Sequence, residues 1–227
     1  MAIKPRDLAK IIDHTLLSPT ANVEDVKQLC KEAIEYKFAS VCVNPIFVPM
    51  AVKLLKDTSV KVATVVGFPL GSNTTEAKAF QTKQLVKEGA QEIGMVLNLG
   101  AFKSGAYDLV RADIKAVTEA ARVSSLGAGA LVKVIFEAAY LSEEELVKAS
   151  EIVLDAGADF IEISTGYGPN GAQEEDVSVI RKKVGRDIGV KASVGITNFE
   201  EAVDMLDAGA NRLGTKHGIN IVTPKDD

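Results

Sequence analysis

Short apolar segments that suit buried strands alternate with amphipathic helical patterns along the whole chain, and this alternation restricts the fold most strongly. The expected strands cover residues 11–15, 39–44, 61–68, 92–97, 132–138, 160–165, 189–194 and 212–216. The expected helices cover residues 23–37, 47–57, 74–89, 107–122, 142–156, 173–184 and 198–208. Such alternation is typical of an α/β fold with a parallel sheet, and eight strands predict a closed (β/α)8 TIM barrel. An open doubly wound sheet is the alternative, but no glycine-rich dinucleotide loop follows the first strand.

The chain shows no linker or low-complexity segment, so we expect residues 1–227 to form a single domain. Three helical patterns end at a glycine followed by alanine and the next strand, at Gly89, Gly157 and Gly209. After the eighth strand only residues 218–227 remain, which predicts a last helix that is very short or absent. That would leave one side of the barrel to solvent or another subunit, so we expect a monomer or homodimer.

Composition excludes several classes of function. The chain is 47% hydrophobic and 25% charged, as soluble globular proteins are, and its net charge of −5 argues against a nucleic-acid surface. No apolar run approaches the ~20 residues of a membrane helix, and residues 1–6 lack the apolar region of a signal peptide. Cys30 and Cys42 suit two buried thiols better than a disulfide framework or a metal cluster. We therefore expect a cytoplasmic protein without metal or cofactor.

A series of distinct short motifs lies along the expected strands and the loops that follow them. They are residues 12–17 (IDHTLL), 40–45 (SVCVNP), 66–71 (VGFPLG) with 73–76 (NTTE), 95–98 (MVLN) with 103–105 (KSG), 132–135 (VKVI) with Glu137, 159–166 (DFIEISTG), 190–193 (VKAS) and 214–215 (GT). Taken in this order, they resemble the motifs of the deoxyribose-phosphate aldolase family of class I aldolase barrels. The resemblance covers nearly the whole chain and implies carbon–carbon bond chemistry through a lysine Schiff base, without a cofactor.

At two positions that the resemblance places in the catalytic centre, this chain has a different residue from the family. The resemblance implies a Schiff-base lysine where this chain has Glu162, and a proton-shuttling aspartate where it has Gly94. A carboxylate cannot attack a carbonyl to form an imine. We therefore expect the native deoxyribose-phosphate aldolase activity to be lost.

Further departures cluster around the same barrel mouth. Val194 replaces the first of two glycines that approach the substrate phosphate, and Lys216 and His217 replace small residues of the family's phosphate loop. Ala138 stands where threonine is usual, and Thr197 where an arginine is common. Random drift would scatter substitutions, so this clustering favours a rebuilt, engineered active site. A natural paralogue with a changed substrate is the alternative.

The inward residues follow from strand alternation, because barrel active sites lie at the carboxyl ends of the strands. We expect Glu162, Lys133 and Lys191 to converge in the interior, with Lys133 either functional or paired to Glu137 or Glu162. Lys191 matches the family's second active-site lysine, and we expect it to pair with Glu162. The remaining expected members of the pocket are Asp13, Thr15, Cys42, Gly94, Ala138, Ser164, Gly166, Tyr167, Val194 and Gly195. We interpret His14 as a packed structural residue, and assign support roles to Asn98 and Lys103.

Three functions remain open from the sequence. In the first, Lys216 or Lys191 forms a Schiff base with a carbonyl substrate, and Glu162, Tyr167 or His217 moves the proton. We expect Lys216, nearer the mouth, to be the nucleophile. In the second, Glu162 or His217 acts as general base on a carbon acid. In the third, Glu162 neutralises Lys191 and the barrel is an inactive scaffold.

Overall fold

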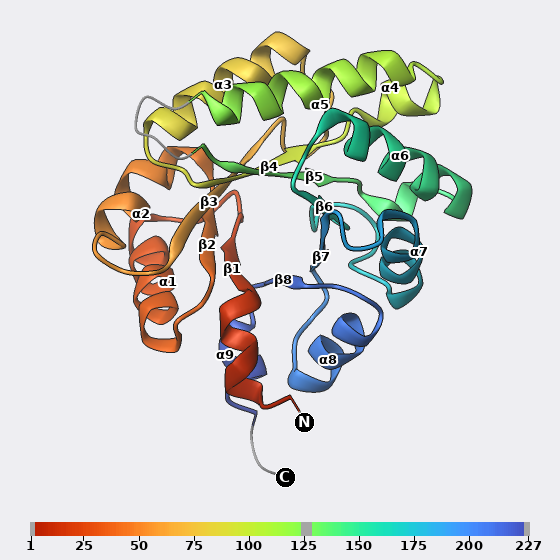
Figure 1. Cartoon of the computed structure of the whole chain (residues 1–227). Coiled ribbons are helices and arrows are strands. Elements are labelled where there is room, and N and C mark those ends of the chain that lie inside the picture. The colour runs from red at the N-terminus through yellow and green to blue at the C-terminus, as the bar shows by residue number, and fades with distance from the viewer. Residues whose placement is uncertain (1–2, 124–128, 225–227) are drawn as a thin grey trace.

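The computed structural model describes residues 3–123 and 129–224, and in them eight parallel strands close into a barrel (Figure 1). Each strand pairs with the next, and β8 pairs with β1. The strands are β1 Ile12–Leu16, β2 Ser40–Val43, β3 Lys61–Val66, β4 Glu92–Val96, β5 Leu131–Ile135, β6 Phe160–Glu162, β7 Gly189–Ser193 and β8 Arg212–Thr215. The predicted (β/α)8 barrel is confirmed.

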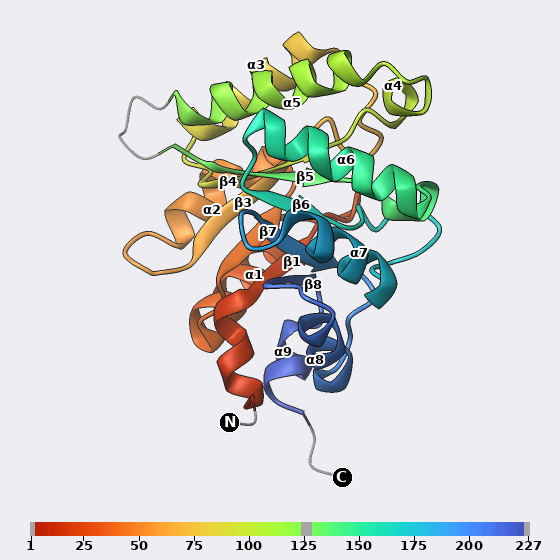
Figure 2. The same cartoon turned by 45° about the vertical axis from the view of Figure 1, so that its right-hand side comes forward.

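Helices surround the strands and cover their outer faces (Figures 1 and 2). The α-helices are α1 Val23–Tyr36, α2 Val48–Leu54, α3 Thr75–Lys87, α4 Leu99–Lys103, α5 Tyr107–Arg122, α6 Glu143–Ala156, α7 Glu174–Val184, α8 Phe199–Asp207 and α9 Gly218–Val222. The 3-10 helices are η1 Pro5–Ile11, η2 Pro45–Phe47 and η3 Ala138–Tyr140. All seven expected helices are present within a few residues, whereas α4 and the 3-10 turns were not predicted. None of the helices in the described part of the chain is long and apolar enough to cross a membrane.

Side-chain caps fix where several helices begin. Asn22, Thr74, Ser142 and Asn198 each accept a hydrogen bond from a backbone N–H in the first turn of the helix that follows. At the other end of α6, Gly157 takes a left-handed conformation with φ +72°, which glycine adopts without steric cost. These local signals set the length of each βα unit and therefore the positions of the loops at the barrel mouth.

The last helix, α9, is only five residues long, as expected from the short C-terminal segment. The side of the barrel that we expected to remain open is nevertheless partly covered, because η1 packs against α9 (Figures 1 and 2). Leu8 and Ala9 of η1 are buried in the same core as Ile221 and Val222 of α9. The two ends of the chain thus complete the ring of helices together.

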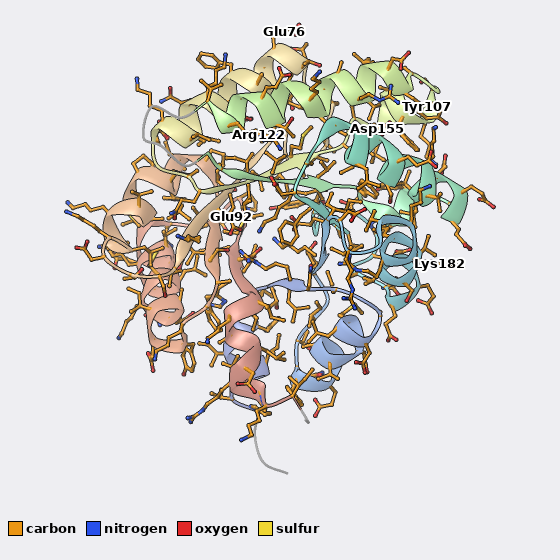
Figure 3. All side chains as sticks on the ribbon, in the orientation of Figure 1. Glu76, Glu92, Tyr107, Arg122, Asp155 and Lys182 are labelled. Carbon is orange, nitrogen blue, oxygen red and sulfur yellow. The ribbon has the colours of Figure 1, made fainter. Side chains whose placement is uncertain are left out.

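Two apolar clusters form the core. The larger fills the space between the strands and the helices. The smaller lies inside the barrel and consists of Cys42, Ala63, Val65, Val96 and Ile135. Charged side chains occupy the rest of the interior, including Glu92, which Figure 3 shows within the ring of strands while Glu76 and Lys182 lie on the outer helices.

Candidate active site

A cavity of about 520 Å³ opens at the carboxyl ends of the strands and reaches down into the barrel. Its volume is typical of a pocket for a small organic ligand. Most of the expected site residues line it: Thr15, Cys42, Gly94, Lys133, Glu162, Ser164, Gly166, Tyr167, Lys191, Val194, Gly195, Lys216 and His217. Two do not, since Asp13 lies fully buried among the charged side chains of the interior and Ala138 packs into the outer core.

Lys133 is held by two carboxylates at the floor of the cavity. Its Nζ lies 2.6 Å from Asp13 Oδ2 and 2.5 Å from Glu92 Oε2. The expected pairing with Glu137 or Glu162 is therefore wrong. The strand register explains why, because Ile135, not Lys133, lies level with Glu162 in the neighbouring strand. Lys133 thus sits one layer deeper than Glu162.

Arg212 completes the network of buried charges beneath the cavity, and the sequence interpretation missed it. Its Nε donates to Asp13 Oδ1 at 2.7 Å, and its Nη2 donates to both oxygens of Glu92 at 2.6 and 2.8 Å. Arg212 and Glu92 are the first residues of β8 and β4. Each stands two residues before an inward glycine, Gly214 or Gly94, so strand alternation could have identified both.

Lys191 lies between two carboxylates. Its Nζ is 2.9 Å from Glu162 Oε1 and 3.0 Å from Asp13 Oδ2, which confirms the expected pair with Glu162. Burial alone would lower the pKa of Lys191, but the negative charges of Asp13 and Glu162 outweigh it and raise this pKa well above its ordinary value. Lys191 is consequently a fixed ammonium group at neutral pH and a poor nucleophile.

Asp13 contacts three cations of the barrel interior. It accepts from Lys133, Lys191 and Arg212, and also from the Ser40 hydroxyl at 2.6 Å. Burial would raise the pKa of Asp13, yet these three cations together hold it well below its usual range. Counting Glu92 and Glu162, three carboxylates balance three cations in one connected network.

One carboxylate oxygen of Glu162, Oε1, forms the ion pair with Lys191, and the other, Oε2, does not. Only 7% of the residue is exposed, and it lines the cavity. Among the described residues, no hydrogen bond reaches its second oxygen, Oε2. Glu162 is therefore placed to accept a proton from a ligand in the cavity.

Glu137 organises the loop between β6 and α7 from below. Its backbone is left-handed with φ +51°, and its carboxylate accepts from Ser164 Oγ at 2.8 Å and from the Thr165 backbone N–H at 3.3 Å. The Thr165 hydroxyl also donates to it. Ser164 Oγ and Thr165 Oγ1 then accept from the backbone N–H groups of Gly166 and Tyr167. This chain of hydrogen bonds fixes the loop that carries Tyr167 over the mouth.

Tyr167 and Phe68 form an aromatic corner at the mouth. Their ring centroids are 5.5 Å apart with an interplanar angle of 88°, an edge-to-face arrangement. The Tyr167 hydroxyl donates to the backbone oxygen of Leu17 at 2.8 Å, which ties the loop after β6 to the loop after β1. The corner is therefore formed before any ligand binds.

Val194 lies at the end of β7 and His217 lies in the loop after β8, the two places where the sequence resemblance implies a phosphate loop. The Val194 N–H donates to the Gly214 oxygen at 3.1 Å, and the His217 N–H donates to Thr215 Oγ1 at 2.9 Å. Both amides are therefore already occupied and unavailable to an anion. Lys216 lines the cavity, is exposed, and forms no ion pair with any residue in the described ranges.

Val194 itself is conformationally strained. Its φ is +66°, a left-handed conformation that a β-branched side chain tolerates poorly. We expect Val194→Gly to stabilise the protein by about 1 kcal/mol, because relief of roughly 1–3 kcal/mol of strain exceeds the entropic cost of glycine. Urea unfolding measures this change, and Val190→Gly, at a buried position without a positive φ, is the matched control and should destabilise. A less stable Val194→Gly variant would show that the loop accommodates valine without strain.

Four further candidate residues have structural roles. His14 is buried on the outer face of β1, where its Nε2 lies 2.7 Å from Glu32 Oε2 and its ring packs on Phe38, as expected for a structural histidine. Burial raises the pKa of the Cys42 thiol to about 12, so this cysteine contributes apolar surface and not a thiolate. Asn98 caps α4, and Lys103 reaches Glu145 on the surface at 2.5 Å.

A (β/α)8 barrel with buried lysines and carboxylates under a cavity at its C-terminal mouth is typical of an aldolase-type lyase. Comparison with known proteins identifies the group more narrowly. The family model described as DeoC/LacD family aldolase matches residues 7–222. A deoxyribose-phosphate aldolase from Caldanaerobacter subterraneus subsp. tengcongensis is 56% identical over 216 residues, covering 95% of this chain and 92% of the relative. The chain therefore belongs to the DeoC/LacD aldolase family.

Solved structures agree with this assignment. QR15, described as an aldolase, superposes with a TM-score of 0.89 at 41% identity, covering 95% of this chain and 94% of that one. The tetrameric deoxyribose phosphate aldolase from Aeropyrum pernix gives a TM-score of 0.88 at 33% identity, covering 96% and 91%. Family and fold together support a lyase of the class I aldolase type.

Proposed function

We propose that this protein is an aldolase-type carbon–carbon lyase that forms its Schiff base on Lys216, in a site rebuilt from that of its relatives. The observation that carries the proposal is the state of the three lysines of the cavity. Lys133 and Lys191 are each held by two carboxylates, whereas Lys216 is exposed to the cavity without an ion pair in the described structure. An amine must be unprotonated to attack a carbonyl, and the carboxylates of Asp13 and Glu162 oppose that by raising the pKa of Lys191. The Nζ of Lys133 is committed to its ion pairs with Asp13 and Glu92.

The chemistry of cleavage follows from these positions. The Lys216 amine adds to the ketone carbon of a β-hydroxy carbonyl compound, and loss of water gives an iminium ion. Glu162 Oε2 takes the proton of the β-hydroxyl group, the carbon–carbon bond breaks, and its electron pair moves into the iminium to give an enamine. Protonation of the enamine carbon and hydrolysis of the imine release the second product and restore Lys216.

The buried ammonium of Lys191 has a positioning role in this scheme. It holds Glu162 Oε1 at 2.9 Å and so keeps the carboxylate aimed in one direction. Asp13 in turn fixes Lys191 from below at 3.0 Å. The charge network that prevents Lys191 from acting as a nucleophile thereby prepares Glu162 to act as a base.

The native reaction of the relatives should be absent. We expect no useful cleavage of 2-deoxyribose 5-phosphate, because Glu162 and Gly94 replace the two central groups and Val194 obstructs the phosphate loop. Glu162→Lys alone should recover little of it. A coupled assay for the released glyceraldehyde 3-phosphate measures this, with an active relative as positive control. Robust cleavage by the unmodified chain would show that its altered residues do not remove the family's reaction.

Reduction with borohydride in the presence of acetone tests the proposed class of chemistry. We expect the intact protein mass to increase by one isopropyl group, because borohydride reduces the imine to a stable secondary amine. If no adduct forms and Glu162→Gln abolishes proton exchange in an activated carbon acid, Glu162 is a general base and the imine proposal is wrong. If neither activity is found, the Glu162–Lys191 pair belongs to an inactive scaffold.

A further inference from the structure

The side chains that line the cavity indicate the polarity of the compound that it binds. Apolar side chains form most of its walls above the charged floor, among them Leu16, Leu17, Val65, Phe68, Ile135 and Val194. Val194 projects into the mouth with 39% of its surface exposed. A ligand with apolar surface would gain burial against these walls, at about 25 cal/mol per Å².

The charged floor offers little to a charged ligand. Lys133, Lys191, Glu92 and Glu162 reach the cavity, but their ion pairs with one another and with Asp13 are only 2.5 to 3.0 Å long. A ligand carboxylate or phosphate would have to displace a carboxylate of the protein from a buried cation, and would leave that carboxylate unpaired. The network therefore favours a ligand without charge.

Two backbone amides of the mouth are also occupied already. The amides of Val194 and His217 donate to Gly214 and Thr215, and so cannot turn to a phosphate without breaking those bonds. The remaining cation, Lys216, is assigned to the carbonyl in the proposed function. Nothing else among the lining residues of the described chain supplies a second unpaired cation.

Phe68 and Tyr167 supply a preformed site for a ring. Their edge-to-face contact at 5.5 Å and the hydrogen bond from Tyr167 to Leu17 at 2.8 Å hold both rings in place. Both rings line the cavity, so an aromatic ring of a ligand can pack against them in the same edge-to-face or stacked geometry. Gly94 lies deeper in the wall, where it is closely packed, because even a Cβ there would lie 3.3 Å from Ile135 Cδ1.

From these observations we propose that the substrate is an uncharged β-hydroxy ketone with an aryl group on the hydroxyl-bearing carbon. This inference rests on the proposed function for the cleavage step, but the binding of the ring is independent of it. The ring lies against Phe68 and Tyr167, the ketone faces Lys216, and the hydroxyl faces Glu162. Cleavage of 4-hydroxy-4-phenylbutan-2-one would then give benzaldehyde and acetone, with no oxidant or further reactant.

The ring site is tested first with a compound that cannot form an imine. We expect 4-phenylbutan-2-ol to bind, and Phe68→Ala and Tyr167→Ala each to weaken its Kd by about tenfold, through loss of aromatic contact and apolar burial. Phe80→Ala is the matched control, because Phe80 is 73% exposed on α3 and does not line the cavity. Isothermal titration or ligand-observed NMR gives the Kd values, and thermal melting verifies that each variant is folded.

Turnover then separates this inference from the proposed function. We expect kcat/KM for 4-hydroxy-4-phenylbutan-2-one to exceed that for its para-carboxylate analogue by at least about tenfold, because the carboxylate must be desolvated without a partner. If acetone is trapped on the protein but Phe68→Ala leaves the Kd of the alcohol unchanged, the ring site is wrong and the imine proposal stands. If the alcohol binds as expected but nothing is trapped, the ring site stands and the lyase proposal fails. Equal turnover of the two aryl substrates would overturn the preference for an uncharged ligand.

Discussion

Lys216→Met is expected to reduce kcat/KM for carbon–carbon cleavage on the order of 100-fold or more, because it removes the amine that forms the covalent intermediate. Methionine keeps a similar length and occupies the same exposed position at the mouth, so the fold should not change. The measurement is the initial rate of benzaldehyde release from 4-hydroxy-4-phenylbutan-2-one. Lys182→Met is the matched control, since Lys182 lies exposed on the outer helix α7 (Figure 3) and should retain full activity.

Lys191→Met should behave differently from Lys216→Met. It leaves the nucleophile in place but removes the ammonium that holds Glu162, so kcat should fall about tenfold while KM changes little, because the carboxylate is no longer fixed in one orientation. Imine trapping should persist in this variant. A Lys216→Met variant that keeps its activity, together with an inactive Lys191→Met, would reverse our assignment of the two lysines.

Asp13→Asn should be the most destabilising single substitution in the interior. It removes the carboxylate shared by Lys133, Lys191 and Arg212, and a broken buried ion pair typically costs about 3–5 kcal/mol. Urea unfolding at pH 7 measures the free energy of unfolding. Asp108→Asn is the matched control, because Asp108 pairs with Arg111 on the fully exposed side of α5 and should show no measurable change.

The pH dependence of this effect has a definite sign. The cations lower the pKa of Asp13 in the folded protein, so its contribution to stability is fully present above the ordinary carboxyl value of about 4. That contribution is lost as the pH falls through the lower pKa of the native state. The difference between the parent chain and Asp13→Asn should therefore be largest at neutral pH and shrink in acid. An unchanged free energy of unfolding at pH 7 would mean that the network is not a stabilising unit.

Strand alternation was sufficient to predict much of the site. The barrel followed from alternating strand and helix patterns, and the period of two along strands placed Glu162, Lys133 and Lys191 inside. Strand alternation also made it possible to predict the Glu162–Lys191 ion pair, because these two residues are directly opposite each other in the register of β6 and β7. The barrel, the inward-facing residues and the Glu162–Lys191 pair depend only on residues that are close in sequence or on adjacent strands. Such relations can be inferred from the sequence.

Contacts across the barrel could not be predicted in the same way. One partner of Lys133, Asp13, lies on β1, and its depth relative to β5 depends on the stagger of strands around the whole circle. The other partner, Glu92, lies on the adjacent strand β4, two residues before the residue that pairs with Lys133. The positive φ of Val194 likewise depends on how the end of β7 meets β8, where the Val194 amide donates to the Gly214 oxygen. Helix α4 was missed because five residues are too few to show a helical period.

Identification of the lysine that carries the imine tests the central claim most directly. The parent protein is incubated with acetone at neutral pH, reduced with borohydride and digested, and the modified peptide is sequenced by tandem mass spectrometry. We expect isopropyl modification at Lys216, with Lys133 and Lys191 unmodified because both remain in buried ion pairs. Modification at Lys191 that persists in Lys216→Met would contradict it, since a lysine held between Asp13 and Glu162 would then be the nucleophile.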